Sequence, residues 1–147
     1  MEIQYINELT KNKDIHDIYN IGNESLPIYY NIYQLLELHK NPIYNIYKCV
    51  LDNLTIGFVI IEICSINKIH IMSIAISKKY RGNGYGSQII EFLKKKFENQ
   101  TISLYVQTQN KRAVQFYYKH NFESKKLLEN YYYELEYKSA YYCEYTP

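Results

Sequence analysis

The 147-residue chain is poor in cysteine, proline and glycine, and it contains no long apolar run. The cysteines Cys49, Cys64 and Cys143 are odd in number, widely spaced and in no metal-ligand pattern. They predict reduced thiols of an intracellular protein, and no metal site is expected. No stretch reaches membrane-spanning length, and no apolar signal core follows the N-terminus. We therefore expect a cytoplasmic or nuclear protein without a membrane partner.

An excess of one charge is also lacking, since the formal net charge is only +2. The lysine run at residues 94–96 has no broad basic stripe beside it, so we expect a solvated helix face and no direct nucleic-acid partner. Hydrophobic residues make up 47% and charged residues 22% of the chain, which is typical of a folded domain. No internal repeat or linker is apparent. The length then predicts a single domain over residues 1–147.

Hydrophobic periodicity predicts an α+β fold with a mixed sheet and the element order β-α-α-β-β-β-α-β-α-β-β. The expected strands are residues 2–6, 43–51, 54–64, 69–77, 102–106, 123–128 and 139–145, of which the second to fourth form an antiparallel meander. The expected helices are one capped by Asp14 and carrying Ile15, Ile18 and Ile21, one around residues 30–38, one with Ile89, Ile90, Leu93 and Phe97 on its apolar face, and one over residues 111–120.

Glycine is rare but concentrated, because three of the five glycines lie in YRGNGYGS, residues 80–87. This stretch separates a predicted strand from a predicted helix. Glycines there let backbone N–H groups face an anion, and the helix dipole adds partial positive charge. Arg81, one of only two arginines, would add a charge-assisted contact. The stretch lacks the lysine of a P-loop and does not follow the first strand of a parallel βαβ unit, so another kind of phosphate or pyrophosphate site is expected.

The run Arg81-Gly82-Asn83-Gly84-Tyr85-Gly86 matches the Arg/Gln-x-x-Gly-x-Gly/Ala signature of the GCN5-related N-acetyltransferases (the GNAT family), and the chain resembles that family. Downstream, Asn110, a helix ending in Tyr117 and the turn His120-Asn121-Phe122 resemble its second signature. Asn121 replaces the usual glycine, and asparagine also tolerates left-handed geometry. The resemblance implies the acyl-CoA N-acyltransferase fold with a splayed central sheet, and acetyl-CoA as the donor with coenzyme A as product.

The same resemblance implies how the donor is held. Its pyrophosphate would lie on the backbone of residues 81–87, and its pantetheine arm would pair with the strand at residues 74–76 and contact Asn110. Tyr117 would stand near the sulfur, where its hydroxyl can donate to the leaving thiolate. The expected cofactor-binding residues are Ile74, Ala75, Ile76, Arg81, Gly82, Asn83, Gly84, Tyr85, Gly86, Ser87, Asn110 and Tyr117.

Three further stretches resemble the protein N-terminal acetyltransferases, most of all the NatE type, which acts on Met-starting peptides. They are Leu26-Pro27-Ile28-Tyr29-Tyr30, His70-Ile71-Met72-Ser73-Ile74 and Asn130-Tyr131-Tyr132. An N-terminal methionine needs an apolar slot, and the peptide backbone needs hydroxyl partners. The expected substrate-binding residues are Leu26, Pro27, Ile28, Tyr30, Tyr131, Tyr132 and Leu135. The resemblance also implies, besides the peptide or protein N-terminus, a ribosome-associated N-terminal acetyltransferase complex as partner.

The chain departs from the NatE pattern at the chemistry. In that type a tyrosine on the strand before the glycine loop and a histidine on the next strand hold a water that takes the proton of the amine. Here His70 stands at the tyrosine position and Tyr105 at the histidine position. A neutral imidazole with an unperturbed pKa of about 6.5 suits a base near pH 7, and Tyr105 would orient the water. We expect His70, Tyr105 and Tyr117 to be catalytic, in direct transfer within a ternary complex.

Two alternatives stay open at this point. The first is a GNAT acetyltransferase for small amines or internal lysines, because the family acetylates many amines. The second is a coenzyme A-binding subunit that has lost catalysis through the exchange of His70 and Tyr105. An acyl-enzyme on cysteine is not expected, because Cys49 and Cys64 fall in meander strands with no evident base nearby.

Overall fold

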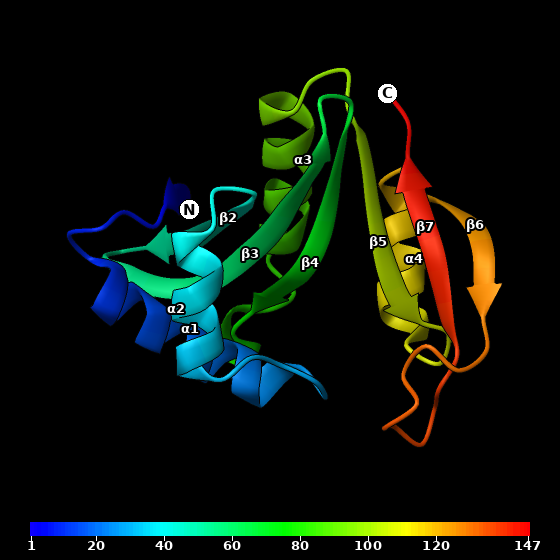
Figure 1. The fold of residues 1–147 in the computed structure, drawn as a ribbon, viewed down its shortest axis with the longest axis horizontal. Coiled ribbons are helices and arrows are strands. Elements are labelled where there is room, and N and C mark those ends of the chain that lie inside the picture. Colours follow the sequence, from blue (N-terminus) through cyan, green and yellow to red (C-terminus); the bar gives the residue numbers. More distant parts are fainter.

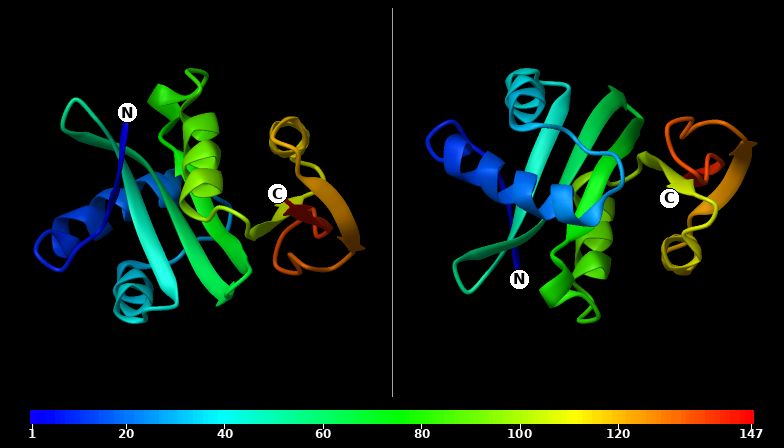
Figure 2. Two further views of the ribbon diagram at one scale, coloured as in Figure 1. Left: turned by 90° about the horizontal axis from the view of Figure 1, so that it is seen from above. Right: turned by 90° about the horizontal axis from the view of Figure 1, so that it is seen from below.

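The computed structural model describes residues 1–147, which form a seven-stranded mixed sheet with helices on both faces (Figures 1 and 2). The strands lie in the order β1-β2-β3-β4-β5-β7-β6. They are β1 (Glu2–Tyr5), β2 (Tyr44–Leu51), β3 (Leu54–Ser65), β4 (Lys68–Ile76), β5 (Thr101–Gln107), β6 (Glu123–Leu128) and β7 (Ala140–Tyr145). The helices are α1 (Lys11–Ser25), α2 (Ile32–Lys40), the short 3-10 helix η1 (Lys78–Tyr80), α3 (Tyr85–Lys96) and α4 (Lys111–Lys119). The predicted mixed α+β fold and element order are confirmed.

Two apolar cores lie on opposite faces of the sheet. The strand β3 supplies both, because successive side chains of a strand point to opposite faces. Phe58 and Ile60 pack toward α1 and α2, whereas Val59 and Ile61 pack into the core that contains residues of α3, α4 and β5. All four side chains are fully buried. None of the helices combines the length and apolar character needed to cross a membrane.

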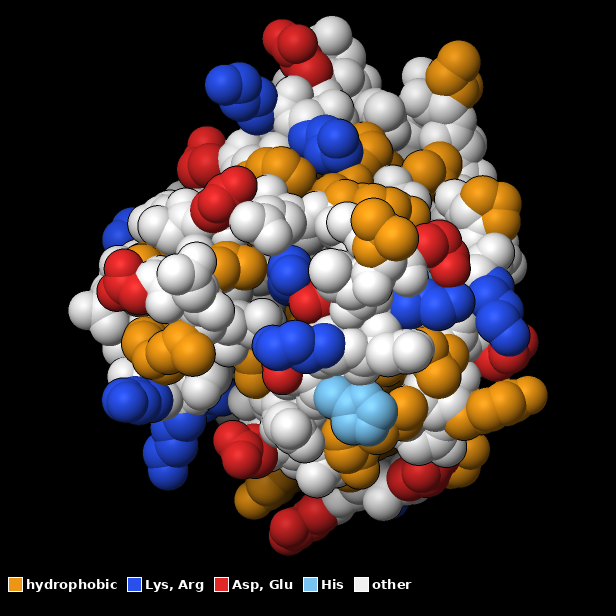
Figure 3. All heavy atoms as spheres, turned by 90° about the vertical axis from the view of Figure 1, so that its left-hand side faces the viewer, with side chains coloured by type: hydrophobic (Ala, Val, Ile, Leu, Met, Phe, Trp, Pro, Cys, Tyr) orange, Lys and Arg blue, Asp and Glu red, His pale blue; other side chains and the backbone are white.

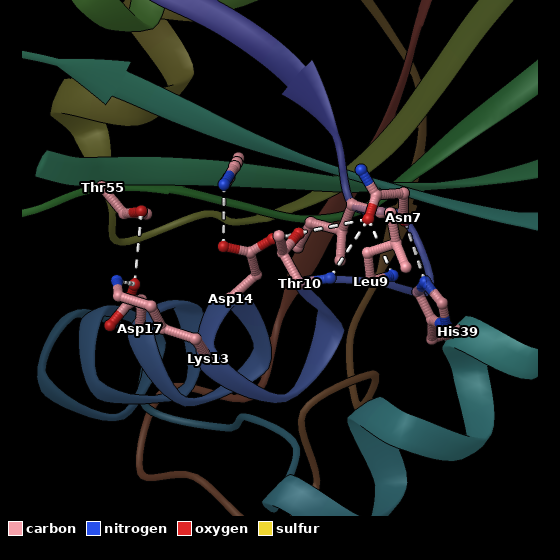
Figure 4. A network of polar contacts seen from close by, with 10 residues as sticks. Asn7, Leu9, Thr10, Lys13, Asp14, Asp17, His39 and Thr55 are labelled. Atoms are coloured by element: carbon pink, nitrogen blue, oxygen red, sulfur yellow. Dashed lines mark hydrogen bonds and ion pairs between the residues drawn. The ribbon is translucent and has the colours of Figure 1, made fainter. Parts of the chain in front are cut away.

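The prediction that Asp14 caps the first helix is wrong. The helix α1 begins at Lys11 with Thr10 at the N-cap position, and Asp14 lies inside it and is 2% exposed. The Asp14 carboxylate accepts hydrogen bonds from Thr10 Oγ1 at 2.6 Å and from Lys48 Nζ on β2 at 2.8 Å (Figure 4). The buried carboxylate of Asp14 therefore links α1 to the sheet and does not cap the N-terminus of the helix.

The outer face formed by α1 and its neighbours carries charges of both signs. Basic and acidic side chains are interspersed there, and single hydrophobic side chains lie between them (Figure 3). Several of the charges pair within one helix, as Lys13 does with Asp17 at 2.6 Å. Such short-range surface pairs contribute little to stability, about 0.3–0.5 kcal/mol each. This face therefore has no single-sign field of its own.

The sheet opens between β4 and β5, and this opening positions the site. The two strands pair in parallel only between residues 68–71 and residues 101–104, and beyond that point they diverge (Figure 1). A bulge marks the same place on the other side of β4, since Ile60 pairs with Ser73 and Ile61 with Ile71, which leaves Met72 without a partner. Residues 72–76 of β4 thus have a strand neighbour on one side only. Their other edge faces the opening, which agrees with the splayed sheet that the sequence resemblance predicts.

Candidate active site

A cavity of about 410 Å³ lies between the end of β4, the loop before α3, and α4. The loop owes its shape to Gly82 and Gly84, which both have φ of +81°, a left-handed conformation that favours glycine. A Cβ at either position would meet nothing within 4 Å, so the space above the loop is open. The helix α3 begins directly after Gly84 and has no side-chain cap. Its first N–H groups are therefore free to bind an anion.

The structure brings eleven of the twelve predicted cofactor-binding residues to this cavity. They are Ile74, Ala75, Ile76, Arg81, Gly82, Gly84, Tyr85, Gly86, Ser87, Asn110 and Tyr117. The exception is Asn83, whose side-chain Nδ2 donates to the carbonyls of Tyr80 at 3.1 Å and Arg81 at 3.2 Å. Asn83 therefore holds the loop together and does not line the cavity.

Both arginines of the chain border this cavity. Arg81 Nε donates to the Ile76 carbonyl at 2.9 Å, which fixes the guanidinium beside the end of β4. Arg112, in the first turn of α4, was missed by the sequence reasoning. Composition could have indicated Arg112, because arginine is rare in this chain and the second of its two arginines lies two residues after Asn110. Guanidinium groups suit phosphate oxygens because they present several N–H donors in a planar fork.

A second cavity, of about 520 Å³, lies on the other side of the opening between β4 and β5. It is lined by His70, Tyr105 and all seven residues predicted to bind the acceptor, namely Leu26, Pro27, Ile28, Tyr30, Tyr131, Tyr132 and Leu135. Tyr29, Gln34 and Gln107 also line it and were not predicted. No aspartate, glutamate, lysine or arginine is among the 21 lining residues. The cavity therefore offers aromatic, aliphatic and neutral polar groups, without a formal charge.

The two cavities meet at Tyr117. Tyr117 lines both of them, together with Leu26, Ile74, Asn110 and Ala113. Its side chain is 8% exposed, and burial raises the pKa of the phenol above its ordinary value. The hydroxyl is therefore protonated throughout the physiological range. Asn110 also caps α4, because its side-chain oxygen accepts from Ala113 N–H at 3.2 Å.

His70 faces the second cavity from β4 and is joined to the neighbouring strand. Its Nδ1 lies 2.7 Å from Ser103 Oγ on β5, and its ring packs edge-on against Tyr105 with centroids 5.2 Å apart. Burial, together with the positive charge of Lys68, lowers the pKa of the imidazole to about 4. The assumption of an unperturbed pKa near 6.5 is therefore wrong. His70 is neutral at physiological pH, but it is a weaker base than the sequence suggested.

An aromatic wall connects His70 to the loop between β6 and β7. The Tyr105 ring stacks on Tyr131 with centroids 4.2 Å apart and an interplanar angle of 19°, and Tyr131 in turn packs edge-on against Tyr132 at 4.8 Å. Burial raises the pKa of the Tyr132 hydroxyl to about 12. Two hydrogen bonds tie the loop to itself and to β5: Tyr132 N–H donates to the Lys138 carbonyl at 2.9 Å, and Gln107 Nε2 to the Tyr137 carbonyl at 2.6 Å.

Comparisons with known proteins agree with this geometry. Residues 12–122 match the model of the acetyltransferase (GNAT) family, and the chain belongs to this family. It is 28% identical over 134 residues to an N-alpha-acetyltransferase of Saccharolobus solfataricus, a match that covers 81% of this chain and 80% of the relative. The crystal structure of Ard1 from Thermoplasma volcanium is similar with a TM-score of 0.84 and 27% identity over 99% of this chain and 96% of that one. Arabidopsis thaliana Naa50 in complex with the bisubstrate analogue CoA-Ac-MVNAL shares the fold with a TM-score of 0.79 at 21% identity, over 99% and 98% of the two chains.

The protein is thus an N-acetyltransferase, and its donor is acetyl-CoA. The first cavity fits this donor on three counts: open space above two left-handed glycines, free N–H groups at the start of α3, and a strand edge without a partner at residues 72–76. The glycine loop and Arg81 would hold the phosphates, and the edge of β4 would hold the amide groups of the pantetheine arm. The thioester of the bound donor supplies the activated acetyl group.

Proposed function

We propose that the protein acetylates the α-amino group at the N-terminus of peptides and proteins. The observation that carries this proposal is the acceptor cavity, whose lining has no charged side chain. A lysine or polyamine nitrogen, with an unperturbed lysine pKa of about 10.4, arrives as a cation, and burying an unpaired cation is costly. An α-amino group has a pKa of about 7.7–8.0 and is partly neutral near pH 7. An uncharged cavity therefore favours the α-amine over the alternatives.

The first residue of the acceptor is proposed to be methionine. Leu26, Pro27, Ile28 and Leu135 give the cavity an aliphatic part of its lining, which suits an unbranched apolar side chain. Each buried CH₂ of such a side chain contributes about 0.8 kcal/mol of binding free energy. The hydroxyls of Tyr30, Tyr131 and Tyr132 are available to the peptide backbone. The N-alpha-acetyltransferase relative supports an α-amine as the acceptor group.

The proposed reaction is direct transfer within a ternary complex. Because the two cavities share Tyr117, donor and acceptor can be bound together at that residue. None of the three cysteines lines either cavity, and burial raises the pKa of the Cys49 thiol to about 12. The chain therefore offers no activated thiol for an acyl-enzyme.

The residues of the chain account for the proton balance of this reaction. A backbone N–H group of residues 74–76 would polarise the thioester carbonyl while the neutral amine attacks it. His70 would take one proton from the amine nitrogen through a water molecule that Tyr105 orients, and Tyr117 would give one proton to the leaving sulfur. Solvent then returns a proton from His70 to Tyr117, so no net proton is consumed. Since a base with a pKa of about 4 holds a proton only briefly, positioning of the two substrates would supply much of the rate.

The proposal includes a setting for the enzyme. We infer that residues 1–147 act as a single catalytic domain in the cytoplasm or nucleus, and that the enzyme docks on a larger N-terminal acetyltransferase complex at the ribosome, where new N-termini emerge. Co-sedimentation of the tagged protein with ribosomes from its own host tests the docking. Recovery only in the ribosome-free fraction would contradict that part of the proposal and leave the acceptor class untouched.

The acceptor class is tested with a panel of amines. Acetyl-CoA turnover is measured with Met-Leu-, Met-Ala- and Ser-starting peptides, with a peptide whose α-amine is blocked but which carries an internal lysine, and with spermidine. We expect the Met-starting peptides to be the best acceptors and the blocked peptide to be inert. Turnover only of spermidine or of the blocked peptide would overturn the proposal, and no turnover of any amine would favour a non-catalytic subunit.

A further inference from the structure

Ser103 contacts His70 from the strand opposite to it. The two residues are direct partners in the parallel pairing of β4 with β5, and their side chains are joined by the 2.7 Å contact between Ser103 Oγ and His70 Nδ1. Ser103 is 0% exposed, although serine is a residue usually found at the surface. A buried hydroxyl must find its partners within the protein, because leaving it unpaired in a buried site is destabilising.

The two polar partners of the Ser103 hydroxyl favour one direction for its proton. Besides His70 Nδ1, Ser103 Oγ has the Ile69 carbonyl at 3.5 Å. A carbonyl can only accept, so the hydroxyl proton must point to it for that bond to form. The 2.7 Å contact is then completed only if His70 Nδ1 carries a proton and donates it to Oγ. In the opposite arrangement the hydroxyl donates to Nδ1, and the hydrogen bond to the Ile69 carbonyl is lost.

The second ring nitrogen of His70 gives the same answer. The contact with Ser103 is the only protein hydrogen bond of the imidazole. His39 Nδ1 and Gln100 Oε1 are the buried polar side-chain atoms without a hydrogen-bond partner. His70 Nε2 is therefore not buried, and His70 lines the acceptor cavity. A proton on Nε2 would find no protein acceptor there, whereas a lone pair on Nε2 would face the place where the amine arrives.

We propose that Ser103 is a positioning residue that holds His70 as the Nδ1–H tautomer and thereby presents the Nε2 lone pair to the acceptor amine. The proposal deepens the proposed function and rests on it, because only an acetyl acceptor gives the lone pair a proton to take. Ser103 itself does not reach the reacting atoms. It acts through His70, since the hydrogen bond made by one imidazole nitrogen decides the state of the other.

The groups around the imidazole are compatible with a neutral ring. Lys68, on the same strand, is held by Tyr142 Oη at 2.5 Å and by Glu144 at 3.5 Å, and its positive charge disfavours an imidazolium. Glu62 is the partner of His70 in the pairing of β3 with β4, and Tyr105 packs on the ring from β5. The Ser103 hydroxyl is the one group among these that makes a hydrogen bond to the ring.

Nuclear magnetic resonance of the imidazole nitrogens tests the tautomer without any substrate. The chain has four histidines, and a His70→Gln variant identifies the signals of His70. We expect a protonated Nδ1 and an unprotonated Nε2 in the wild type at pH 7, and a mixture of tautomers in Ser103→Ala. A wild-type ring with its proton on Nε2 would overturn the proposal, as would an unchanged tautomer in Ser103→Ala. This arm is readable even if the proposed acceptor class fails.

A double-mutant cycle tests whether Ser103 acts through His70. Ser103→Ala alone is expected to lower kcat about tenfold, with the KM for acetyl-CoA unchanged. Added to His70→Phe, the same substitution is expected to lower kcat by less than about twofold. Ser103→Thr keeps the hydroxyl and is expected to keep most of the rate. Thr101→Val removes a hydroxyl two positions earlier on β5 and serves as the matched control, with a rate within twofold of wild type.

An equal loss on both backgrounds would mean that Ser103 supports the strand rather than the histidine, and the proposal would then fail. Where Ser103→Ala does not fold, the wild-type ring nitrogens and the Ser103→Thr variant decide the question. A proton on Nε2 in the wild type still contradicts the proposal in that case.

Discussion

The donor and acceptor cavities share a wall but are built in opposite ways. The donor cavity offers backbone groups at three places, namely two left-handed glycines, an uncapped helix start and a strand edge without a partner, and both arginines border it. The acceptor cavity is lined by aromatic, aliphatic and neutral polar residues, including the stacked Tyr105 and Tyr131, and none of its lining side chains is charged. The donor is the same molecule whatever the acceptor is. The choice of acceptor therefore falls to the other cavity. Because of this difference, substitutions at the junction are expected to alter the rate, those in the donor cavity the affinity for acetyl-CoA, and those in the acceptor cavity the binding of the acceptor.

The largest effect is expected at Tyr117, where the two cavities meet. Tyr117→Phe removes the one proton donor at the junction and keeps the packing, so kcat is expected to fall about 100-fold, at the lower end of what general acid catalysis contributes. The KM values for both substrates are expected to stay within threefold. Steady-state kinetics with a Met-Leu peptide measures this, and a kcat within threefold of wild type would remove Tyr117 from the mechanism.

Gly84→Ala is expected to weaken the binding of acetyl-CoA without affecting the binding of the peptide. A non-glycine residue at φ of +81° costs about 1–2 kcal/mol, which corresponds to about a tenfold weaker binding of acetyl-CoA if the loop relaxes away from its present shape. The KM for the peptide should not change. Asn99→Ala is the matched control, since Asn99 also has a positive φ, of 65°, but lies outside both cavities. A larger change in the peptide KM than in the acetyl-CoA KM would contradict the division between the cavities.

The pH dependence of stability tests the surroundings of His70. Its pKa is about 4 in the folded protein and about 6.5 when unfolded, so the unfolded chain binds more protons between these values. The stability contribution is present above pH 6.5 and is lost as the pH falls through 4. After allowing for solvent screening, the loss is about 1–2 kcal/mol. Urea unfolding of wild type and His70→Phe at pH 4 to 7 should show their difference in free energy changing by this amount, and a constant difference would contradict the assigned burial.

The smallest of these effects is expected on the acceptor side at Tyr131. Tyr131→Ala removes the ring stacked on Tyr105, and an aromatic pair contributes about 0.5–1.5 kcal/mol. The peptide KM should rise about fivefold while the acetyl-CoA KM stays constant. Tyr133→Ala is the matched control, because Tyr133 is 71% exposed and does not line either cavity. Equal effects of the two variants would mean that the loop matters only as a whole.

Most of the fold could be predicted from the sequence because its elements follow local periodicity. The strand β3 is rich in apolar residues and lies between two turns, and α3 begins directly after Gly84. The failure at Asp14 has a long-range cause, since its partner Lys48 is 34 positions away and on another element. An acidic residue ahead of three spaced isoleucines satisfies the rules for a cap equally well, and only the packing of α1 on the sheet decides between the two.

The candidate site was predictable to the extent that it consists of short contiguous stretches. The glycine loop and the Leu26-Pro27-Ile28 stretch lie at the predicted cavities. The pKa of His70 was not predictable, because it results from burial among strands that pair over long distances. Ser103 was missed for the same reason: only the register of β4 with β5 brings its hydroxyl to His70. Arg112 could have been predicted from composition, because it is one of only two arginines in the chain.

The central claim is that an uncharged acceptor cavity selects the α-amine. It is tested most directly with one peptide that begins with Met-Leu and carries an internal lysine, incubated with the enzyme and acetyl-CoA. Fragmentation mass spectrometry then locates the acetyl group. The account predicts acetylation of the α-nitrogen with at least about a 100-fold excess over the lysine nitrogen, since the pKa values of the two amines differ by more than two units. Acetylation of the lysine at a comparable or higher level would contradict it.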